Sequence, residues 1–404
     1  MIGEHLVSVR ASLEAGTMDN MHNKTTDARD CSAMTSPRRQ LTQSPLLDAA
    51  FGVQPAHRPV WFMRQAGRSL PEYRRVREKI GMLDACFTPD IAAEITLQPV
   101  RRHNVDAAIF FSDIIIPLKA AGIDIDIAAG RGPVVDMPIR SRREIDSLPE
   151  LEPSALSSIG EAIRNIIDEL RDDQALIGFA GAPFTMASYL IEGGPSKTHQ
   201  KTKAMIYADP ESWHALMRIL TEYVKVFLGV QIDAGIDAMQ LFDSWAGYLR
   251  ARDYEEFVAP YSSEIFTFVR ERSSHGGRHP IPRIHFGVTS GELLGSMAGT
   301  GPDVVGVDWR VDMTIAAERV TTAVIAKDTA RQCKPLALQG NLDPALLFAG
   351  DKAVDREIDR LLTTTDQLIS GGKISGHIVN LGHGVLPDTD PEIISHIVEK
   401  VHSW

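Results

Sequence analysis

A basic segment offers the clearest binding chemistry in this chain. Residues 58–79 contain seven Lys or Arg and two Asp or Glu, a local balance of +5, although the formal net charge of the chain is −11. Arg64 and Arg68 flank Gly67, whose missing side chain would let a ligand approach the backbone. A guanidinium group is planar and binds a carboxylate through two parallel hydrogen bonds. The segment therefore predicts a site for a polyanion; the alternative is a solvated basic helix face.

Asp113 is the second candidate for chemistry. It follows Ser112 and the apolar residues 107–111, so its carboxylate is expected at the mouth of a buried strand. In such a place a carboxylate can accept hydrogen bonds from N–H groups or stabilise a developing cation. The alternative is that Asp113 or Ser112 caps the next helix.

Three further polar residues are candidates for ligand contacts. His383 lies between Gly382 and Gly384, directly after an apolar run, which indicates an exposed loop rather than a core face. Tyr189 and Ser244 supply hydroxyl groups close to other predicted strand ends. A core tyrosine and a helix cap are the alternatives for these two residues.

Eight short apolar runs must position these side chains. They alternate with amphipathic stretches of helical length, the pattern of βα units on a parallel sheet. This predicts an α/β fold, a single (β/α)8 TIM barrel whose active site lies at the C-terminal strand ends. An irregular β-hairpin is expected to be inserted at residues 121–138. The predicted strands are residues 59–62, 107–111, 176–180, 238–242, 283–286, 304–307, 336–339 and 377–381.

The N-terminal residues differ in composition from the rest. Residues 1–44 are polar and poor in large apolar side chains, so they are expected to form a disordered tail before a barrel domain at residues 45–404. Neither a signal peptide nor a membrane-spanning run of about 18 apolar residues is evident.

Composition excludes several function classes. The acidic balance opposes binding to nucleic acid or to an anionic membrane surface. The three cysteines, Cys31, Cys86 and Cys333, lie far apart, which fits a reducing cytoplasm better than a disulfide framework. No nucleotide, zinc-protease or calcium motif is found, and we expect neither a cofactor nor a metal at the site.

Two segments resemble the signatures of the uroporphyrinogen decarboxylase family. They are residues 59–73, PVWFMRQAGRSLPEY, and residues 178–185, GFAGAPFT, and the resemblance extends from residue 45 to residue 404. It implies a cytoplasmic homodimer that needs no cofactor and converts the acetate side chains of uroporphyrinogen III into methyl groups during heme biosynthesis. The residues that it implies are Asp113 and Arg64 for catalysis, Arg64, Gln65, Ala66, Gly67 and Arg68 as the substrate-binding loop, and Tyr189, Ser244 and His383 as further substrate contacts.

Two other readings of the chain stay open. One is a cobalamin-linked or coenzyme M methyltransferase, a barrel relative with a His-x-Cys zinc ligand pair. The segment here is His285-Phe286-Gly287, which has no cysteine. The other is a non-catalytic porphyrin carrier, against which Asp113 argues, because binding carboxylates alone does not require a buried acid.

Overall fold

Seven parallel strands form the central sheet. The computed structural model describes residues 39–128, 130–275, 280–327 and 334–404. Each strand pairs in parallel with the next in the order β1-β4-β5-β6-β7-β8-β9. The strands are β1 (Ala107–Ile109), β4 (Ala175–Gly181), β5 (Ala238–Phe242), β6 (Arg283–Phe286), β7 (Val304–Gly306), β8 (Ala337–Gln339) and β9 (His377–Ile378).

An eighth segment closes the sheet between β9 and β1. Val60 forms a parallel bridge with Val379, and the Val379 N–H donates to the Pro59 carbonyl oxygen at 2.8 Å. On the other side, the Asp106 N–H donates to the Val60 carbonyl oxygen at 3.0 Å. The predicted barrel is therefore confirmed. The predicted strand at residues 59–62 is reduced to a single bridge, because Pro59 has no N–H to add to a ladder.

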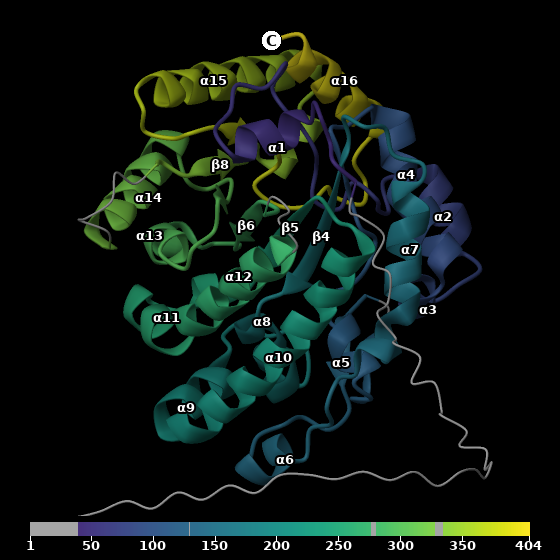
Figure 1. Ribbon diagram of the computed structural model, residues 1–404, viewed down its shortest axis with the longest axis vertical. Helices are drawn as coiled ribbons and strands as arrows, with labels where there is room; N and C mark the ends of the chain where they lie inside the picture. The colour runs from purple at the N-terminus through teal and green to yellow at the C-terminus, as the bar shows by residue number, and fades with distance from the viewer. Residues whose placement is uncertain (1–38, 129, 276–279, 328–333) are drawn as a thin grey trace, which may run out of the picture. The chain divides into compact units, whose positions relative to one another are not determined.

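The helices form a ring of neighbours around the strands (Figure 1). The ring follows the order of the chain except that α12 comes before α11. Its members, in spatial order, are α4 (Pro89–His103), α7 (Ser157–Ile167), α10 (Pro210–Ala234), α12 (Ala259–Ser273), α11 (Ala251–Phe257), α13 (Leu294–Ala298), α14 (Met313–Lys327), α15 (Asp351–Ser370) and α16 (Pro391–His402). Because α16 packs against α4, the ring closes as the barrel does.

Smaller elements complete the two ends of the barrel. The predicted hairpin is confirmed as the antiparallel pair β2 (Ile125–Ala128) and β3 (Gly132–Val135). The remaining helices are α1 (Pro45–Ala50), α2 (Pro71–Arg77), α3 (Met82–Phe87), α5 (Ile116–Ala120), α6 (Arg142–Asp146), α8 (Pro183–Glu192) and α9 (Gln200–Ala208), with 3-10 turns η1 (Pro153–Leu156), η2 (Ala246–Tyr248), η4 (Gly291–Leu293) and η5 (Pro344–Phe348).

The barrel interior is a packed core. Leu46 and Ala49 of α1 join the cluster of side chains inside the strands, so α1 closes the N-terminal end. A polar chain crosses this interior. The Trp61 indole N–H donates to Gln339 at 3.1 Å, and the Gln339 amide donates to Gln240 at 2.8 Å. These bonds satisfy polar groups that burial would otherwise leave costly.

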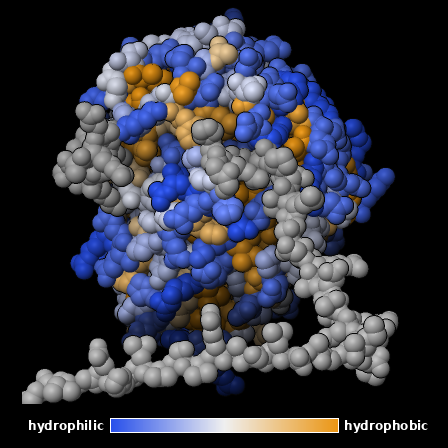
Figure 2. Space-filling view, viewed as in Figure 1, coloured by the Kyte–Doolittle hydropathy of each residue, from blue (hydrophilic) through white to orange (hydrophobic). Residues whose placement is uncertain are grey.

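The exterior is mostly hydrophilic on the face that Figure 2 shows, with apolar residues in small areas. None of the helices in the described parts of the chain is long and apolar enough to cross a bilayer. Residues 1–38 of the predicted tail lie outside the described residues. Arg39 forms an ion pair with Asp237 at 2.6 Å.

Candidate active site at the C-terminal strand ends

The predicted site residues follow the C-terminal ends of different barrel strands. Arg64 follows the closing segment, Asp113 follows β1, Ser244 follows β5 and His383 follows β9, while Tyr189 lies in α8 directly after β4. Because all the strands are parallel, these ends meet at one face of the barrel. The structure therefore places the predicted residues together at this face, and their role as a site stays a prediction.

The loop of residues 63–68 is fixed by buried backbone contacts. Gln65 is buried; its side-chain oxygen accepts from the Phe62 N–H and its amide donates to the Ala107 carbonyl oxygen, both at 2.9 Å. A Cβ atom at Gly67 would lie 2.7 Å from the Arg64 carbonyl oxygen, so only glycine fits this turn. Arg64 has a left-handed φ of 61°. Arg64 and Arg68 keep exposed side chains, whereas the Gln65 amide is already used in holding the loop.

The two glycines beside His383 allow close packing. A Cβ atom at Gly384 would lie 2.5 Å from Cδ of Arg64, and one at Gly382 would lie 2.0 Å from the backbone nitrogen of Trp309. The Arg64 side chain therefore packs directly against the backbone of the loop after β9.

His383 is held in one tautomer. Its Nδ1 accepts a hydrogen bond from the Gly384 N–H at 2.7 Å. Burial lowers the pKa of His383, and the positive charge of Arg64 lowers it further. A neutral ring that accepts at Nδ1 carries its proton on Nε2, so His383 can donate a hydrogen bond from Nε2.

Asp113 lies in a poorly solvated position close to Arg64. Its Oδ1 accepts from the Ile115 N–H at 3.1 Å. Burial raises the pKa of Asp113, while backbone N–H groups and the charge of Arg64 oppose that rise. The pKa of Tyr189 is also raised by burial and by the charge of Asp113, and Arg64 again acts in the opposite direction. The structure thus brings Asp113, Tyr189 and His383 within electrostatic reach of Arg64.

Ser244 follows β5 at this face, and its neighbour Trp245 contacts Tyr189 and Thr185. The rings of Trp245 and Tyr189 lie 4.1 Å apart between centroids, and the backbone N–H of Trp245 donates to the Thr185 hydroxyl at 3.4 Å. The same hydroxyl donates to Asp243 at 3.2 Å. Asp243 is fully buried, and burial raises its pKa to about 7.

Beneath the charged residues the barrel is lined with aromatic rings. Phe179 and Phe242 meet edge to face at 5.4 Å, and Phe242 meets Phe286 at 6.1 Å. Ile114, beside Asp113, packs against the same interior cluster. An apolar floor of this kind strengthens the electrostatic interactions of charges placed above it.

Two residues near the site were not among the predicted ones. Asn380 is buried, and its Oδ1 accepts from the Met63 N–H at 3.1 Å, which anchors the start of the Arg64 loop. A polar residue inside an apolar run could have indicated this. Arg310 influences the pKa of His383 and forms an ion pair with Asp308 at 2.8 Å. No pattern in the sequence marks Arg310.

The chain matches known proteins over nearly its whole length. A family model described as uroporphyrinogen decarboxylase (URO-D) matches residues 41–404. The chain belongs to the uroporphyrinogen decarboxylase family. A uroporphyrinogen decarboxylase of Corynebacterium glutamicum (strain R) is 58% identical over 92% of this chain and 100% of its own length. One from Nocardia farcinica is 55% identical over 91% of this chain and 98% of its own.

A solved structure supports the fold of this uroporphyrinogen decarboxylase family member. A methyltransferase from Methanosarcina mazei superposes with a TM-score of 0.69 at 17% identity, covering 89% of this chain and 98% of that one. At this identity the likeness concerns the fold alone.

Cys86, the cysteine within the described residues, is buried and burial raises the pKa of its thiol, which disfavours a thiolate ligand.

Proposed function

We propose that this chain decarboxylates the four acetate side chains of uroporphyrinogen III to methyl groups, which yields coproporphyrinogen III in heme biosynthesis. The observation that carries the proposal is the approach of Arg64 to the poorly solvated carboxyl of Asp113, on a chain of this family. The substrate is a polycarboxylate with N–H groups at its centre. Arg64 can bind a carboxylate at its periphery, and the Asp113 carboxylate can accept hydrogen bonds from the central N–H groups.

The substrate can supply its own electron sink. Loss of carbon dioxide leaves an electron pair, which many enzymes place on a bound cofactor. Protonation of the pyrrole carbon next to the one that bears the acetate gives a cationic ring in which the acetate-bearing carbon is conjugated with the iminium group. That ring takes up the electron pair as the carbon–carbon bond breaks and carbon dioxide leaves. Protonation of the exocyclic carbon then forms the methyl group, and loss of the ring proton restores the pyrrole.

Asp113 would stabilise this cation. Its carboxylate can accept hydrogen bonds from several pyrrole N–H groups at once, which would place a fixed negative charge below the positive ring. The apolar floor of Phe179, Phe242 and Phe286 keeps the surroundings poor in water, so the interaction is stronger than in solvent. Donation by pyrrole N–H groups favours the ionised form and opposes the effect of burial on the Asp113 pKa.

The two arginines would bind the carboxylates of the substrate. Arg64 and Arg68 are exposed on a loop that the Gln65 side chain and the turn at Gly67 hold in place, so the loop can present both guanidinium groups without rearrangement. Arg64 is also the candidate proton donor. An arginine side chain keeps its proton in proteins and is a poor general acid, so this role depends on a relay. We therefore assign carboxylate binding to Arg64 first.

The remaining contacts would orient the macrocycle. His383 offers an Nε2–H donor, as its Nδ1 bond to Gly384 requires. Tyr189 offers a phenol group from α8, and Ser244 a hydroxyl beside Trp245. We further propose that the chain acts as a homodimer in the cytoplasm and binds neither nucleic acid nor membranes, in keeping with its net charge of −11.

Anaerobic turnover of uroporphyrinogen III by metal-stripped protein tests this function. Chromatography of the oxidised products should show a progressive fall from eight carboxyl groups to four. Unchanged substrate in the presence of folded protein would refute the decarboxylase. Retention of the substrate without turnover would then favour the porphyrin carrier, and methyl transfer to a thiol would favour the methyltransferase.

A further inference from the structure

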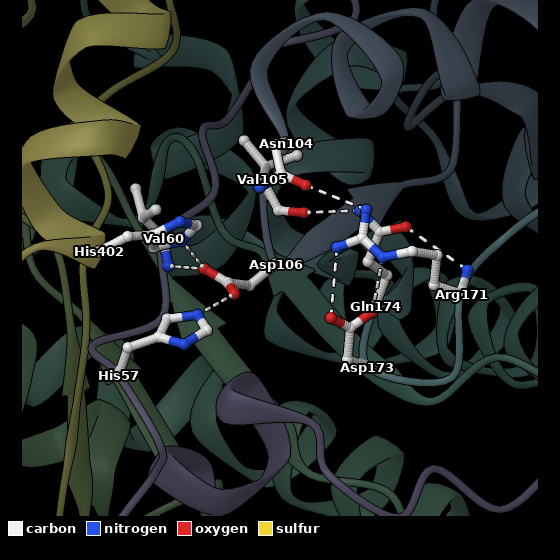
Figure 3. Close-up of polar contacts among 9 residues, drawn as sticks. All are labelled: His57, Val60, Asn104, Val105, Asp106, Arg171, Asp173, Gln174 and His402. Atoms are coloured by element: carbon white, nitrogen blue, oxygen red, sulfur yellow. Dashed lines mark hydrogen bonds and ion pairs between the residues drawn. The ribbon is translucent and has the colours of Figure 1, made fainter.

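Two histidines converge on one carboxylate at the opposite end of the barrel (Figure 3). The Nε2 atom of His57 lies 2.7 Å from Oδ1 of Asp106, and the Nε2 atom of His402 lies 2.9 Å from Oδ2. The two imidazole rings lie 4.3 Å apart between centroids, at an angle of 60°. Each histidine thus presents its outer ring nitrogen to a different oxygen of the same side chain.

These residues come from distant parts of the chain. His57 precedes the closing segment of the sheet, Asp106 precedes β1, and His402 is the last residue of α16. Because both Asp106 and His57 come before the strands that they introduce, the cluster lies at the N-terminal end of the barrel, away from the site of Arg64 and Asp113.

We propose that His57, Asp106 and His402 form a binding site for a divalent zinc ion. Their ligand atoms all lie within 4.8 Å of one another. Imidazole nitrogen and carboxylate oxygen are common zinc ligands, with bonds of about 2.0–2.2 Å. Placing the ion between the three side chains requires each Nε2 to move away from the carboxylate by a fraction of an ångström. The half-buried imidazoles can turn by that amount.

Asp106 is already oriented for this role. Its Oδ2 accepts the Val60 N–H at 2.7 Å, and the side chain is only 6% exposed. A ligand fixed by an outer hydrogen bond loses little freedom when it binds a metal. The backbone of the closing segment therefore holds the carboxylate in place while the two histidines adjust.

A cavity leaves room for the fourth ligand. A space of about 440 Å³ adjoins the two histidines, so a water molecule can complete a four-coordinate zinc ion. Arg58 lines the same cavity, but its charge is compensated by an ion pair with Asp366. Asp173 adds a further negative influence on His57. The nearby charges therefore do not repel a cation.

Zinc would compete with protons at this site. The hydrogen bond from His57 to Asp106 raises the pKa of His57, and the two histidines help to lower the pKa of Asp106. A metal must displace the Nε2 proton of each imidazole, so zinc binding should strengthen as the pH rises. Because the ligands connect the closing segment, β1 and α16, bound zinc would stabilise the closed barrel.

Titration calorimetry with zinc chloride on untagged, metal-stripped protein tests the site. We expect one zinc ion per chain and a melting temperature that rises with zinc concentration. His57→Gln and His402→Gln retain an N–H donor for Asp106 but remove a strong zinc ligand. Each should lower zinc affinity by more than the roughly 10–100-fold typical of losing an outer partner. Magnesium, which prefers oxygen ligands, should not raise the melting temperature.

His396→Gln is the matched control. His396 lies in the same helix as His402 and bonds to Asp355 at 2.7 Å, but that pair does not belong to the cluster. Its zinc affinity should equal that of the wild type. Equal zinc binding by all the variants would overturn the proposal and point to other residues, such as His5, His22 and Cys31. Absence of binding by the wild type would also overturn it.

Anomalous diffraction at the zinc edge gives a readout that needs no variant. In zinc-soaked wild-type crystals, a peak between His57, Asp106 and His402 is expected. A peak elsewhere, or none, contradicts the site even if the variants fail to fold. Turnover of uroporphyrinogen is a separate property of the opposite end of the barrel, so the two proposals can fail independently.

Discussion

The Arg64 side chain rests on the backbone of Gly384. A Cβ atom at that glycine would lie 2.5 Å from Cδ and 2.8 Å from Cγ of Arg64. Such distances are far below ordinary carbon contacts of about 3.5–4.0 Å. The loop after β9 therefore fixes the direction in which Arg64 projects, although 320 residues separate the two in the sequence (384 − 64).

Gly384→Ala should consequently displace Arg64 while leaving the fold intact. We expect KM for uroporphyrinogen III to rise about tenfold, equivalent to the loss of one hydrogen bond to a charged group. Steady-state kinetics and a thermal melt would measure the two effects. Gly160→Ala is the control, because a Cβ atom there meets nothing closer than 3.5 Å. Unchanged kinetics in Gly384→Ala would show that the position of Arg64 does not matter for binding.

Asp113→Asn should reduce turnover more than binding. The amide keeps the size of the side chain but removes the negative charge that would stabilise the cationic ring. A fall in kcat of about 10²–10³-fold is expected, the range seen for loss of one electrostatic contact in a transition state. Single-turnover decarboxylation and substrate binding should be measured separately. Asp126→Asn, an exposed change in the hairpin, should be neutral. A near-normal kcat in Asp113→Asn would remove Asp113 from the mechanism.

Arg64→Lys and Arg68→Lys should both weaken substrate binding. Lysine keeps the positive charge but loses the bidentate geometry that suits a carboxylate, so KM should rise about tenfold or more. Arg75→Lys, an exposed change on the neighbouring helix α2, is the control. If Arg64 also donates the proton, Arg64→Lys will in addition shift the pH–rate profile, whereas Arg68→Lys will not. Wild-type KM in both variants would argue against carboxylate binding by this loop.

Much of the fold and part of the site could be predicted from sequence. Apolar runs alternate with helices because buried parallel strands carry little polarity, and polar residues after those runs must lie at one barrel face. The structure confirms this for the placement of Arg64, Asp113 and His383. The contact between Arg64 and Gly384 depends on the twist and register of strands at the seam of the barrel. The spacing of residues along the chain therefore does not predict this contact.

The same limit explains the cluster at the other end. His57 and Asp106 are 49 residues apart, and Asp106 and His402 are 296 apart. Zinc sites are recognised in sequences by short, regular spacings of ligands. Closure of the barrel brings these three residues together, so their spacing along the chain does not group them.

Buried neutral histidines should make the fold sensitive to acid. Burial lowers the pKa of His285 from 6.5 to about 3. The unfolded imidazole binds a proton below about pH 6.5, whereas the folded one stays neutral, so stability falls as the pH drops through this window. His285→Gln should reduce the slope of the urea midpoint against pH between 6.5 and 4.5, whatever its effect at pH 7. The exposed His275→Gln should keep the wild-type slope. An unchanged slope in His285→Gln would show that this histidine is not a source of acid sensitivity.

His383 should act through its Nε2–H. Because Nδ1 accepts from the Gly384 N–H at 2.7 Å, Nε2 is the nitrogen that can donate to the substrate. The amide nitrogen of glutamine reaches about as far as Nε2, and that of asparagine only as far as Nδ1. His383→Gln should therefore keep most of kcat/KM, while His383→Asn should lose about tenfold to a hundredfold, as expected for a hydrogen bond to a charged group. The lowered pKa of His383 also predicts that any loss of activity caused by its protonation has its midpoint below about pH 6.5, the usual histidine value. A higher kcat/KM for His383→Asn than for His383→Gln would contradict this. It would mean that activity depends on the Nδ1 position and its bond to Gly384.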